Sequence, residues 1–395
     1  MIMTTSAYDV IVVGLGAAGS AALCHAALSG ARVLGIDRFH PPHEFGSSHG
    51  ETRITRQAIG EGLQFVPLVL RSNILWRDLE AVTGKQLLVQ KGGLILTDHA
   101  THGPGAAFFQ QTVEAARQFA IPHQILSFSE LRERFPQFAF PDGDGGAAYF
   151  EPGAGYLYVE KCITAHLELA TQRGAAVQGG EIVTSIAPSS SHVVVQTDKA
   201  SYAASSVVLT PGPWMPDWAA RICGLTTSPF QVYRQTLYWL AIGQRQHLFS
   251  PERMPVFIWS TATREKNFYG FPSLDSESLK IATELFDAPT AADAPPIAIE
   301  EHQVQSFHRE LVQKRFPDVT AKAVRTMTCF YTMTADHSFV IDHAIDSDRL
   351  WFASACSGHG FKHSAAIGEA LAQKALGQDT VLDLSPFARS RLAVS

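Results

Sequence analysis

The chain has 395 residues, of which 46 % are hydrophobic and 17 % are charged, and its net charge is −6. This length and apolar content predict a large core and two or more domains. The mildly acidic balance argues against a nucleic-acid-binding protein, which would show a basic patch or stripe. Its five cysteines are scattered and odd in number, which excludes a disulfide framework and favours a reducing, cytoplasmic setting.

The N-terminal stretch from residue 10 to residue 31 contains no Asp, Glu, Lys or Arg. It could be mistaken for a signal peptide or a membrane span, but glycines interrupt it and Asp9 precedes it where a signal peptide would carry a positive charge. No other stretch is long enough to cross a bilayer. We therefore expect neither a membrane nor a nucleic acid among the partners.

The same stretch is typical of a βαβ unit. Residues 10–13 form a continuous apolar run, as in a strand buried on both faces. A GxGxxG turn follows, then small apolar residues suited to a helix packed on a sheet, then a second strand over 31–36 that ends at Asp37. This context of strand, turn, helix and acid predicts a dinucleotide-binding site.

Each residue of that motif has a mechanical role. Gly14 permits the tight turn, Gly16 lets the backbone approach a pyrophosphate, and Gly19 allows close helix–strand packing. Asp37 is expected to accept hydrogen bonds from ribose hydroxyls, and the adjacent Arg38 is expected at the cofactor as well. The motif alone does not separate NAD from FAD.

The next notable segment is "GSSHGETRITRQA", residues 46–58. Arg53 and Arg56 lie three residues apart, so they share one side of a helical turn, and His49 precedes them. The segment is either a solvated surface turn or a binding site for an anion. A metal site built from His40, His43 and His49 is not expected, because their spacing matches no standard zinc site.

Further along the chain the patterns change. Residues 92–98 and 235–242 alternate as in strands of an antiparallel sheet, and residues 192–197 and 205–214 contain short strands. Ser127 and Glu130 form a capping box that predicts a helix start, and residues 287–296 are loop-like. Residues 342–376 predict a strand, a Gly-rich turn and an Ala-rich helix. These segments indicate two domains that interrupt each other in sequence.

Several separated blocks carry a resemblance to one family. They are "VIVVGLGAAG", "HPPHEFGSSHGETRITRQAIGEG", "NFYGFPS…SLKI", "TCFYTMTADHSFVID" and "CSGHGFKHSAAIGE". In collinear order and over nearly the whole chain, the sequence resembles the monomeric sarcosine oxidase and N-methyltryptophan oxidase family of flavoenzymes. The resemblance implies a monomeric oxidase that oxidises the C–N bond of a secondary amino acid, and O2 then reoxidises the flavin to give H2O2.

The family also implies an α/β, D-amino-acid-oxidase-like architecture of two domains. A Rossmann-type FAD-binding domain would comprise residues 1–85, 148–222 and 322–395. A substrate domain with an antiparallel sheet over the flavin would comprise residues 86–147 and 223–321.

The resemblance assigns roles to several residues. Arg56 and Lys362 would clamp the substrate carboxylate, and Arg53 and His49 would lie at the flavin. Cys329 would form a thioether to the flavin. Without the resemblance it would be taken for a core residue, because free cysteine is among the most buried residue types. Cys356 lies in a Gly-rich turn but does not match the linking position.

Lys280 would activate O2 through its positive charge. Tyr269 and Tyr331 would line the substrate pocket, and Tyr331 would share a strand face with Cys329. Glu284 departs from the family, which usually carries histidine there. It could attract a second amine on the substrate, or it could turn to solvent. Further cofactor contacts are expected from Gly358, Gly360 and Lys362, and Val183 and Asp342 also match family positions near the cofactor.

Alternatives remain open at this point. Pipecolate-type and fructosyl amino acid oxidases share the implied fold and covalent flavin. An NAD-dependent dehydrogenase would be colourless and would require added nicotinamide. A flavoprotein that passes electrons to a protein partner instead of O2 is a further class, against which Lys280 argues.

Overall fold

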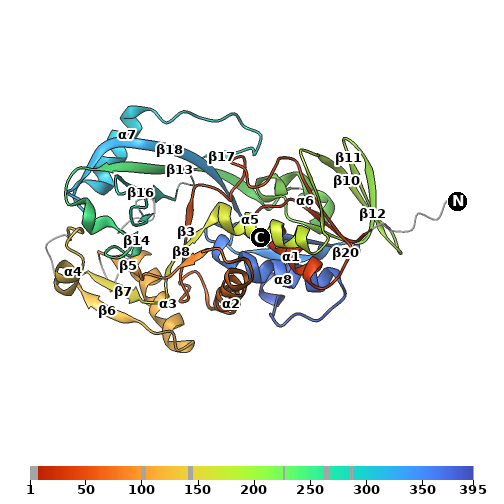
Figure 1. Ribbon diagram of the computed structural model, residues 1–395, viewed down its shortest axis with the longest axis horizontal. Coiled ribbons are helices and arrows are strands. Elements are labelled where there is room, and N and C mark those ends of the chain that lie inside the picture. Colours follow the sequence, from red (N-terminus) through yellow and green to blue (C-terminus); the bar gives the residue numbers. More distant parts are fainter. Residues whose placement is uncertain are drawn as a thin grey trace.

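A computed structural model of the chain describes residues 8–98, 104–140, 146–225, 227–261, 267–284, 286 and 288–394. Two large sheets lie side by side along the long axis of the molecule (Figure 1). Helices α1 (Ala17–Leu28) and α8 (Ser364–Ala375) pack near the first sheet, and the second sheet occupies the other half. This arrangement agrees with the expected α/β fold.

The first sheet has eight strands and a mixed topology. Its parallel part joins β9, β2, β1, β12 and β20, and β10, β11 and β19 add antiparallel pairs. The strands are β1 (Tyr8–Val13), β2 (Val33–Asp37), β9 (Ala176–Gly179), β10 (Val183–Pro188), β11 (Val193–Thr197), β12 (Ser201–Leu209), β19 (Val340–Ala344) and β20 (Ser347–Ser354). The strands expected around 192–197 and 205–214 are confirmed as β11 and the end of β12, which stops at Leu209.

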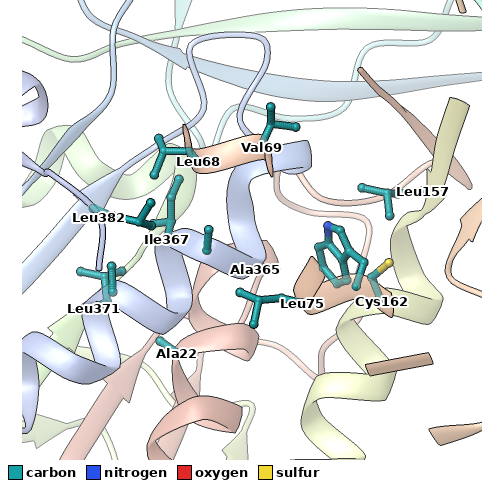
Figure 2. Packing of buried hydrophobic residues seen from close by; sticks show 14 of the residues in the cluster. Ala22, Leu68, Val69, Leu75, Leu157, Cys162, Ala365, Ile367, Leu371 and Leu382 are labelled. Atoms are coloured by element: carbon teal, nitrogen blue, oxygen red, sulfur yellow. The ribbon is translucent and has the colours of Figure 1, made fainter. Parts of the chain in front are cut away.

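A helical layer covers this sheet. α1 packs against α8 and α5 (Val159–Gln172), and α2 (Val66–Thr83) packs against α8. The contact of α1 with α8 is so close that a Cβ atom on Gly368 would lie 2.4 Å from the Ala21 Cβ atom. Figure 2 shows the apolar core between these helices, to which Ala22, Leu75 and Ile367 contribute. The small residues of α1 therefore allow close helix packing.

The second sheet has nine strands in the order β17, β13, β16, β15, β14, β5, β7 and β6, with β18 on the other side of β13. The strands are β5 (Gly93–Thr97), β6 (Gln124–Ser127), β7 (Ala147–Glu151), β13 (Gln231–Ile242), β14 (Val256–Ser260), β15 (Phe268–Gly270), β16 (Ser278–Thr283), β17 (Pro289–Thr290) and β18 (Val319–Met333). The strands expected at 92–98 and 235–242 are both in this sheet. It is antiparallel apart from the parallel pair of β5 and β14.

Smaller elements complete the fold. β3 (Thr52–Thr55), β8 (Gly155–Tyr158) and β4 (Leu88–Val89) form a small sheet between the two large ones. The remaining helices include α3 (Pro104–Gln118), α4 (Phe128–Arg134), α6 (Met215–Cys223) and α7 (Glu301–Phe307). The capping box of Ser127 and Glu130 begins α4 as predicted. Of the loop expected at 287–296, residue 287 lies outside the described residues, and the rest is irregular apart from β17.

Two of the expected domain boundaries fall inside strands. Residue 322 lies within β18, which pairs with β13 from Val319 to Met333, and residue 148 lies within β7, which pairs with β5 and β6. The expected boundaries thus divide two strands that each pair as a whole within the nine-stranded sheet. Within the described ranges, the helices are too short or too polar to cross a membrane.

Candidate active site

The turn after β1 has the shape that the GxGxxG motif requires. Gly14 has φ of +84°, and a Cβ atom there would lie 2.4 Å from the Thr210 carbonyl oxygen. A Cβ atom on Gly19 would lie 1.8 Å from the Gly14 carbonyl oxygen. At Gly16, by contrast, the nearest atom would be the Ser48 Oγ at 3.6 Å. Gly14 and Gly19 thus permit close packing, whereas Gly16 keeps the surface of the turn open.

The Asp37 side chain is held in place at the end of β2. Its carboxylate accepts the Leu15 N–H at 2.7 Å and the Phe39 N–H at 2.8 Å. The next residue, Arg38, has its guanidinium carbon 4.4 Å from the Trp214 ring centroid and pairs with Asp293 at 3.3 Å. Contacts with neighbouring residues therefore hold the Asp37 and Arg38 side chains in place at the end of β2.

A cavity of about 650 Å³ opens over this turn. Expected cofactor residues Gly14, Gly16, Asp37, Arg38 and Val183 line it. Its volume lies within the range of small-molecule and cofactor sites. α1 begins at the cavity wall, with Gly16 at its N-cap and no acidic residue in its first turn. The free N–H groups and positive dipole of such a helix start suit a phosphate, so the residues present fit a bound dinucleotide.

A second, smaller cavity of about 130 Å³ adjoins the first. The two share wall residues that include Ala17, Ser47, Ser48 and Cys356. Many of the other expected site residues line the smaller cavity, namely Arg53, Arg56, Tyr269, Glu284, Tyr331, Gly358, Gly360 and Lys362. The fold thus brings together segments that are separated by up to about 300 positions in the sequence.

The two arginines of segment 46–58, Arg53 and Arg56, differ in their partners. Arg53 donates to the carbonyl oxygens of Ser47 at 2.9 Å and Thr52 at 3.0 Å. Arg56, which is buried, donates to the Glu61 carboxylate and to the Ala58 carbonyl oxygen. The surface-turn alternative is therefore wrong for Arg56, because its charge is enclosed and paired.

Lys362 lies on the turn before α8, and its ammonium donates to the His359 carbonyl oxygen at 2.7 Å. Burial lowers the pKa of Lys362 to about 7, although the carboxylates of Glu61 and Glu284 act in the opposite direction. Burial would raise the pKa of Glu61, but the charges of Arg56, His359 and Lys362 together hold it well below its usual value. The cavity therefore holds an ionised carboxylate among cations.

Tyr269 and Tyr331 approach each other across the small cavity, with their hydroxyl oxygens 3.2 Å apart. Burial raises the pKa of both phenols. Glu284 follows β16 and reaches this side too, because its carboxylate oxygen would lie 3.4 Å from a Cβ atom on Gly358. The hypothesis that Glu284 turns away to solvent is not borne out.

Lys280, Cys329 and His49 line neither of the two cavities but are buried beside them. The Lys280 ammonium donates to the Gly50 carbonyl oxygen and to Thr52, and it lies 4.4 Å from the Phe271 ring centroid. Burial, and then the charge of Arg53, lowers its pKa well below the usual value.

The remaining buried groups are His49 and Cys329. Burial and Arg53 lower the pKa of His49 to about 3, and its Nε2 atom has no hydrogen-bond partner in the part of the chain that the structure describes. Burial raises the pKa of the Cys329 thiol, while Arg53 lowers it. Asp342, by contrast, accepts the backbone N–H of Arg389 and lines neither cavity. Over the described ranges, the His, Cys, Asp and Glu side chains form no group suited to a metal ion.

Sequence reasoning did not single out several residues of the two cavity walls: Ser48, Glu61, Thr210, Trp214 and Asp293. Glu61 lies within a block already recognised, five residues after Arg56, so its spacing to that arginine was an available signal. Asp293 comes from the loop-like segment, and no pattern in the sequence places that segment near Arg38.

Comparison with known proteins agrees with this geometry. Residues 9–374 match the family described as FAD dependent oxidoreductase. The chain is 36 % identical over 391 residues to a monomeric sarcosine oxidase of Streptomyces avermitilis, covering 98 % of each chain. It is 35 % identical over 394 residues to an N-methyl-L-tryptophan oxidase of Yersinia pestis, covering 97 % of this chain and 99 % of that protein.

Among solved structures, NikD, described as an unusual amino acid oxidase essential for nikkomycin biosynthesis, superposes with a TM-score of 0.81 at 24 % identity. The match covers 97 % of this chain and 98 % of that chain, and it supports the fold. The chain therefore belongs to the FAD-dependent oxidoreductase family, with relatives among the monomeric sarcosine oxidases and N-methyltryptophan oxidases. This membership identifies the cofactor as FAD, which the glycine motif alone did not distinguish from NAD.

Proposed function

We propose that this member of the family is an oxidase of secondary amino acids, N-methylated or cyclic. It oxidises the substrate C–N bond to an imine, water hydrolyses the imine, and O2 is reduced to H2O2. FAD would supply the redox chemistry: a hydride equivalent, which carries two electrons, leaves the substrate, and the two electrons pass on to O2 with two protons to give H2O2. The protein supplies position, charge and exclusion of water.

The presence of both Arg56 and Lys362 in the wall of one small cavity carries this proposal. An amino acid brings a carboxylate that loses its hydration on entering a closed site, so it needs cations and hydrogen-bond donors. Both side chains are buried, and both line the cavity that adjoins the dinucleotide cavity. Their charges are well suited to a carboxylate-bearing substrate next to the redox centre.

Other residues would complete the site. Tyr269 and Tyr331 supply hydroxyl groups and apolar ring surface to the substrate. Arg53, held by two carbonyl oxygens, offers a fixed cation near the shared wall, where negative charge on a reduced cofactor would be stabilised. We assign the reaction with O2 to the cation of Lys280, and the covalent link to FAD to Cys329.

The test is an anaerobic titration of the purified yellow protein with sarcosine, larger N-methyl amino acids, pipecolate and primary amino acids. We expect a secondary amino acid to bleach the visible flavin spectrum and air to restore it with release of H2O2. The amide of the active compound, which lacks the carboxylate, is the matched control and should bleach at least about tenfold more weakly. A yellow protein that no amino acid bleaches would contradict the proposal.

A further inference from the structure

The Lys280 ammonium group is bound by a turn whose backbone is strained. The turn comprises residues 50–52 and is closed by a hydrogen bond of 2.9 Å from the Thr52 N–H to the Gly50 carbonyl oxygen. Its central residue, Glu51, has φ of +71°. A turn closed between residues two apart, with positive φ at its centre, is the rare and strained form of the γ-turn. Because such a conformation persists only where its surroundings enforce it, neighbouring groups must hold this turn.

Glu160, in the first turn of α5, supplies such support. One oxygen of its carboxylate, Oε1, accepts the N–H groups of Gly50 at 2.7 Å and Glu51 at 3.1 Å. In the opposite direction, the Glu51 carbonyl oxygen accepts the N–H of Val159, the first residue of α5, at 2.9 Å. Hydrogen bonds in both directions therefore join the start of this helix to the turn, although about 110 positions separate them in sequence.

The peptide group between Gly50 and Glu51 connects Glu160 to Lys280. In a trans peptide group, the N–H and the C=O point in opposite directions. This group donates its N–H to Glu160, and its carbonyl oxygen accepts the Lys280 ammonium. The Thr52 carbonyl oxygen and hydroxyl group accept the same ammonium at 2.9 and 3.0 Å. Glu160 thus fixes the direction of the Gly50 carbonyl group, one of the three acceptors of Lys280.

The turn has a second anchor through the Glu51 side chain. The Glu51 carboxylate accepts the Trp239 indole N–H at 3.1 Å and pairs with Arg325 at 2.8 Å. The Arg325 and Glu51 side chains are 39 % and 41 % exposed, so water screens their ion pair. Loss of the Glu160 carboxylate would therefore leave the turn held mainly by an anchor of this weaker kind.

We propose that Glu160 is a positioning residue for Lys280, because it holds the turn of residues 50–52 in the conformation that binds the Lys280 ammonium for the reaction with O2. This inference rests on the proposed function, in which Lys280 serves that reaction. Since Lys280 lines neither of the two cavities, a change at Glu160 should slow the reaction with O2 much more than the bleaching of the flavin by substrate.

Glu160 also affects the charge of Lys280. Burial, and then Arg53, lowers the pKa of Lys280, and the groups that act in the opposite direction are Glu51, Cys329 and Glu160. The nearby His49, whose pKa burial lowers to about 3, is neutral. Glutamine at position 160 would keep an oxygen that accepts N–H groups but would lack the charge. In Glu160→Gln the O2 reaction should therefore stay near its native rate at low pH, and it should decline at lower pH than in the native protein.

The experiment is stopped-flow mixing of dithionite-reduced enzyme with O2, and separately the anaerobic rate of bleaching by substrate. We expect Glu160→Ala to slow the O2 reaction about tenfold, as on loss of a hydrogen-bond acceptor near a charge, and to change bleaching much less. Glu160→Gln should restore most of the O2 reaction at low pH. Glu168→Ala, which removes an exposed carboxylate of α5 that pairs with Lys85, is the control and should behave as native.

The Lys280→Met background tests whether Glu160 acts through Lys280. Adding Glu160→Ala to Lys280→Met should not slow the O2 reaction further, because the ammonium that the turn binds is already gone. A further slowing there, or equal slowing of both half-reactions in Glu160→Ala, would overturn the inference. If Glu160→Ala does not fold, Glu160→Gln decides, and a native pH dependence in that variant would also overturn the inference.

The failures can be told apart. If no amino acid bleaches the native protein, the proposed function fails, whereas the dithionite-reduced enzyme still reports on Glu160. If Lys280→Met reacts with O2 at the native rate, the role of Lys280 fails and the inference fails with it. If Lys280→Met is slow but Glu160→Ala reacts as native, only the present inference fails.

Discussion

The wall of the 650 Å³ cavity includes the glycine turn after β1, whereas the wall of the 130 Å³ cavity includes charged and phenolic side chains such as Arg56, Lys362 and Tyr331. At the glycine turn, Gly14 and the nearby Gly19 make room for neighbouring carbonyl groups. The wall of the smaller cavity draws on β15, β18, the end of β16 and the turn before α8. The cofactor end thus depends on steric fit, and the substrate end depends on balanced charge.

The largest effect is expected from breaking the steric fit. In Gly19→Val, the added side chain would clash with the Gly14 carbonyl oxygen and the Thr210 Oγ, and the backbone of β1 and α1 cannot move apart cheaply. We expect colourless or insoluble protein, measured as the FAD-to-protein absorbance ratio. Gly30→Ala, at a glycine with no heavy atom within 4 Å of its Cβ position, is the control; because Gly30 has φ of +81°, it should cost some backbone strain but leave the protein yellow. A yellow, stable Gly19→Val protein would contradict this account.

The difference between the walls also explains what the sequence could predict. The apolar run 10–13, the glycine turn and Asp37 are local in sequence, so their structure followed from pattern. The strand pattern of β18 was recognisable within its block, but pattern alone does not tell which sheet a strand joins, and the expected boundary at 322 divided it. Glu61 was missed because its importance depends on the fold of the Arg56 segment. Roles for Lys280 and Cys329 came from family resemblance and not from their local patterns.

The next largest effect concerns Lys280. Three oxygen atoms of Gly50 and Thr52 accept hydrogen bonds from its nitrogen, which suits an ammonium with three donors, although burial and Arg53 lower its pKa. In Lys280→Met, we expect reoxidation of the reduced enzyme by O2 to slow by about 10²–10³-fold, as on loss of a preorganised charge. Lys280→Arg, which keeps the charge, should lose less.

The measurement is stopped-flow mixing of reduced enzyme with O2, separately from the rate of bleaching by substrate. For the native protein, the O2 reaction should slow as pH rises, because the cation is lost as pH passes through a pKa that lies below that of free lysine. Fast reoxidation in Lys280→Met would remove this residue from the reaction with O2.

A smaller effect is expected at the carboxylate clamp. In Lys362→Met, the loss of one buried cation should weaken binding of 3-methylbutanoate, a carboxylate without an amine, by about 30-fold, corresponding to roughly 2 kcal/mol. The Kd is measured from the shift of the flavin spectrum without O2. The pKa of Lys362 is lowered to about 7, so its charge is present below that pH and lost above it. The Kd of the native protein should therefore rise as pH increases above about 7. Lys362→Arg should flatten this dependence, whereas a flat native profile would contradict the assignment.

The smallest effect on activity is expected at the cysteines, where the two regions meet. Cys356 lines both cavities, whereas Cys329 is buried on β18 and lines neither. Burial raises the pKa of both thiols and the Arg53 charge acts in the opposite direction on both. The neighbouring charge therefore does not distinguish the two cysteines, and the choice of Cys329 rests on the family resemblance. Acid precipitation should release free FAD from Cys329→Ser and leave it bound to Cys356→Ser. Because the glycine turn and the large cavity would still hold the cofactor, Cys329→Ser should remain yellow before precipitation. Release of FAD from Cys356→Ser alone would show that Cys356, which lines both cavities, forms the link.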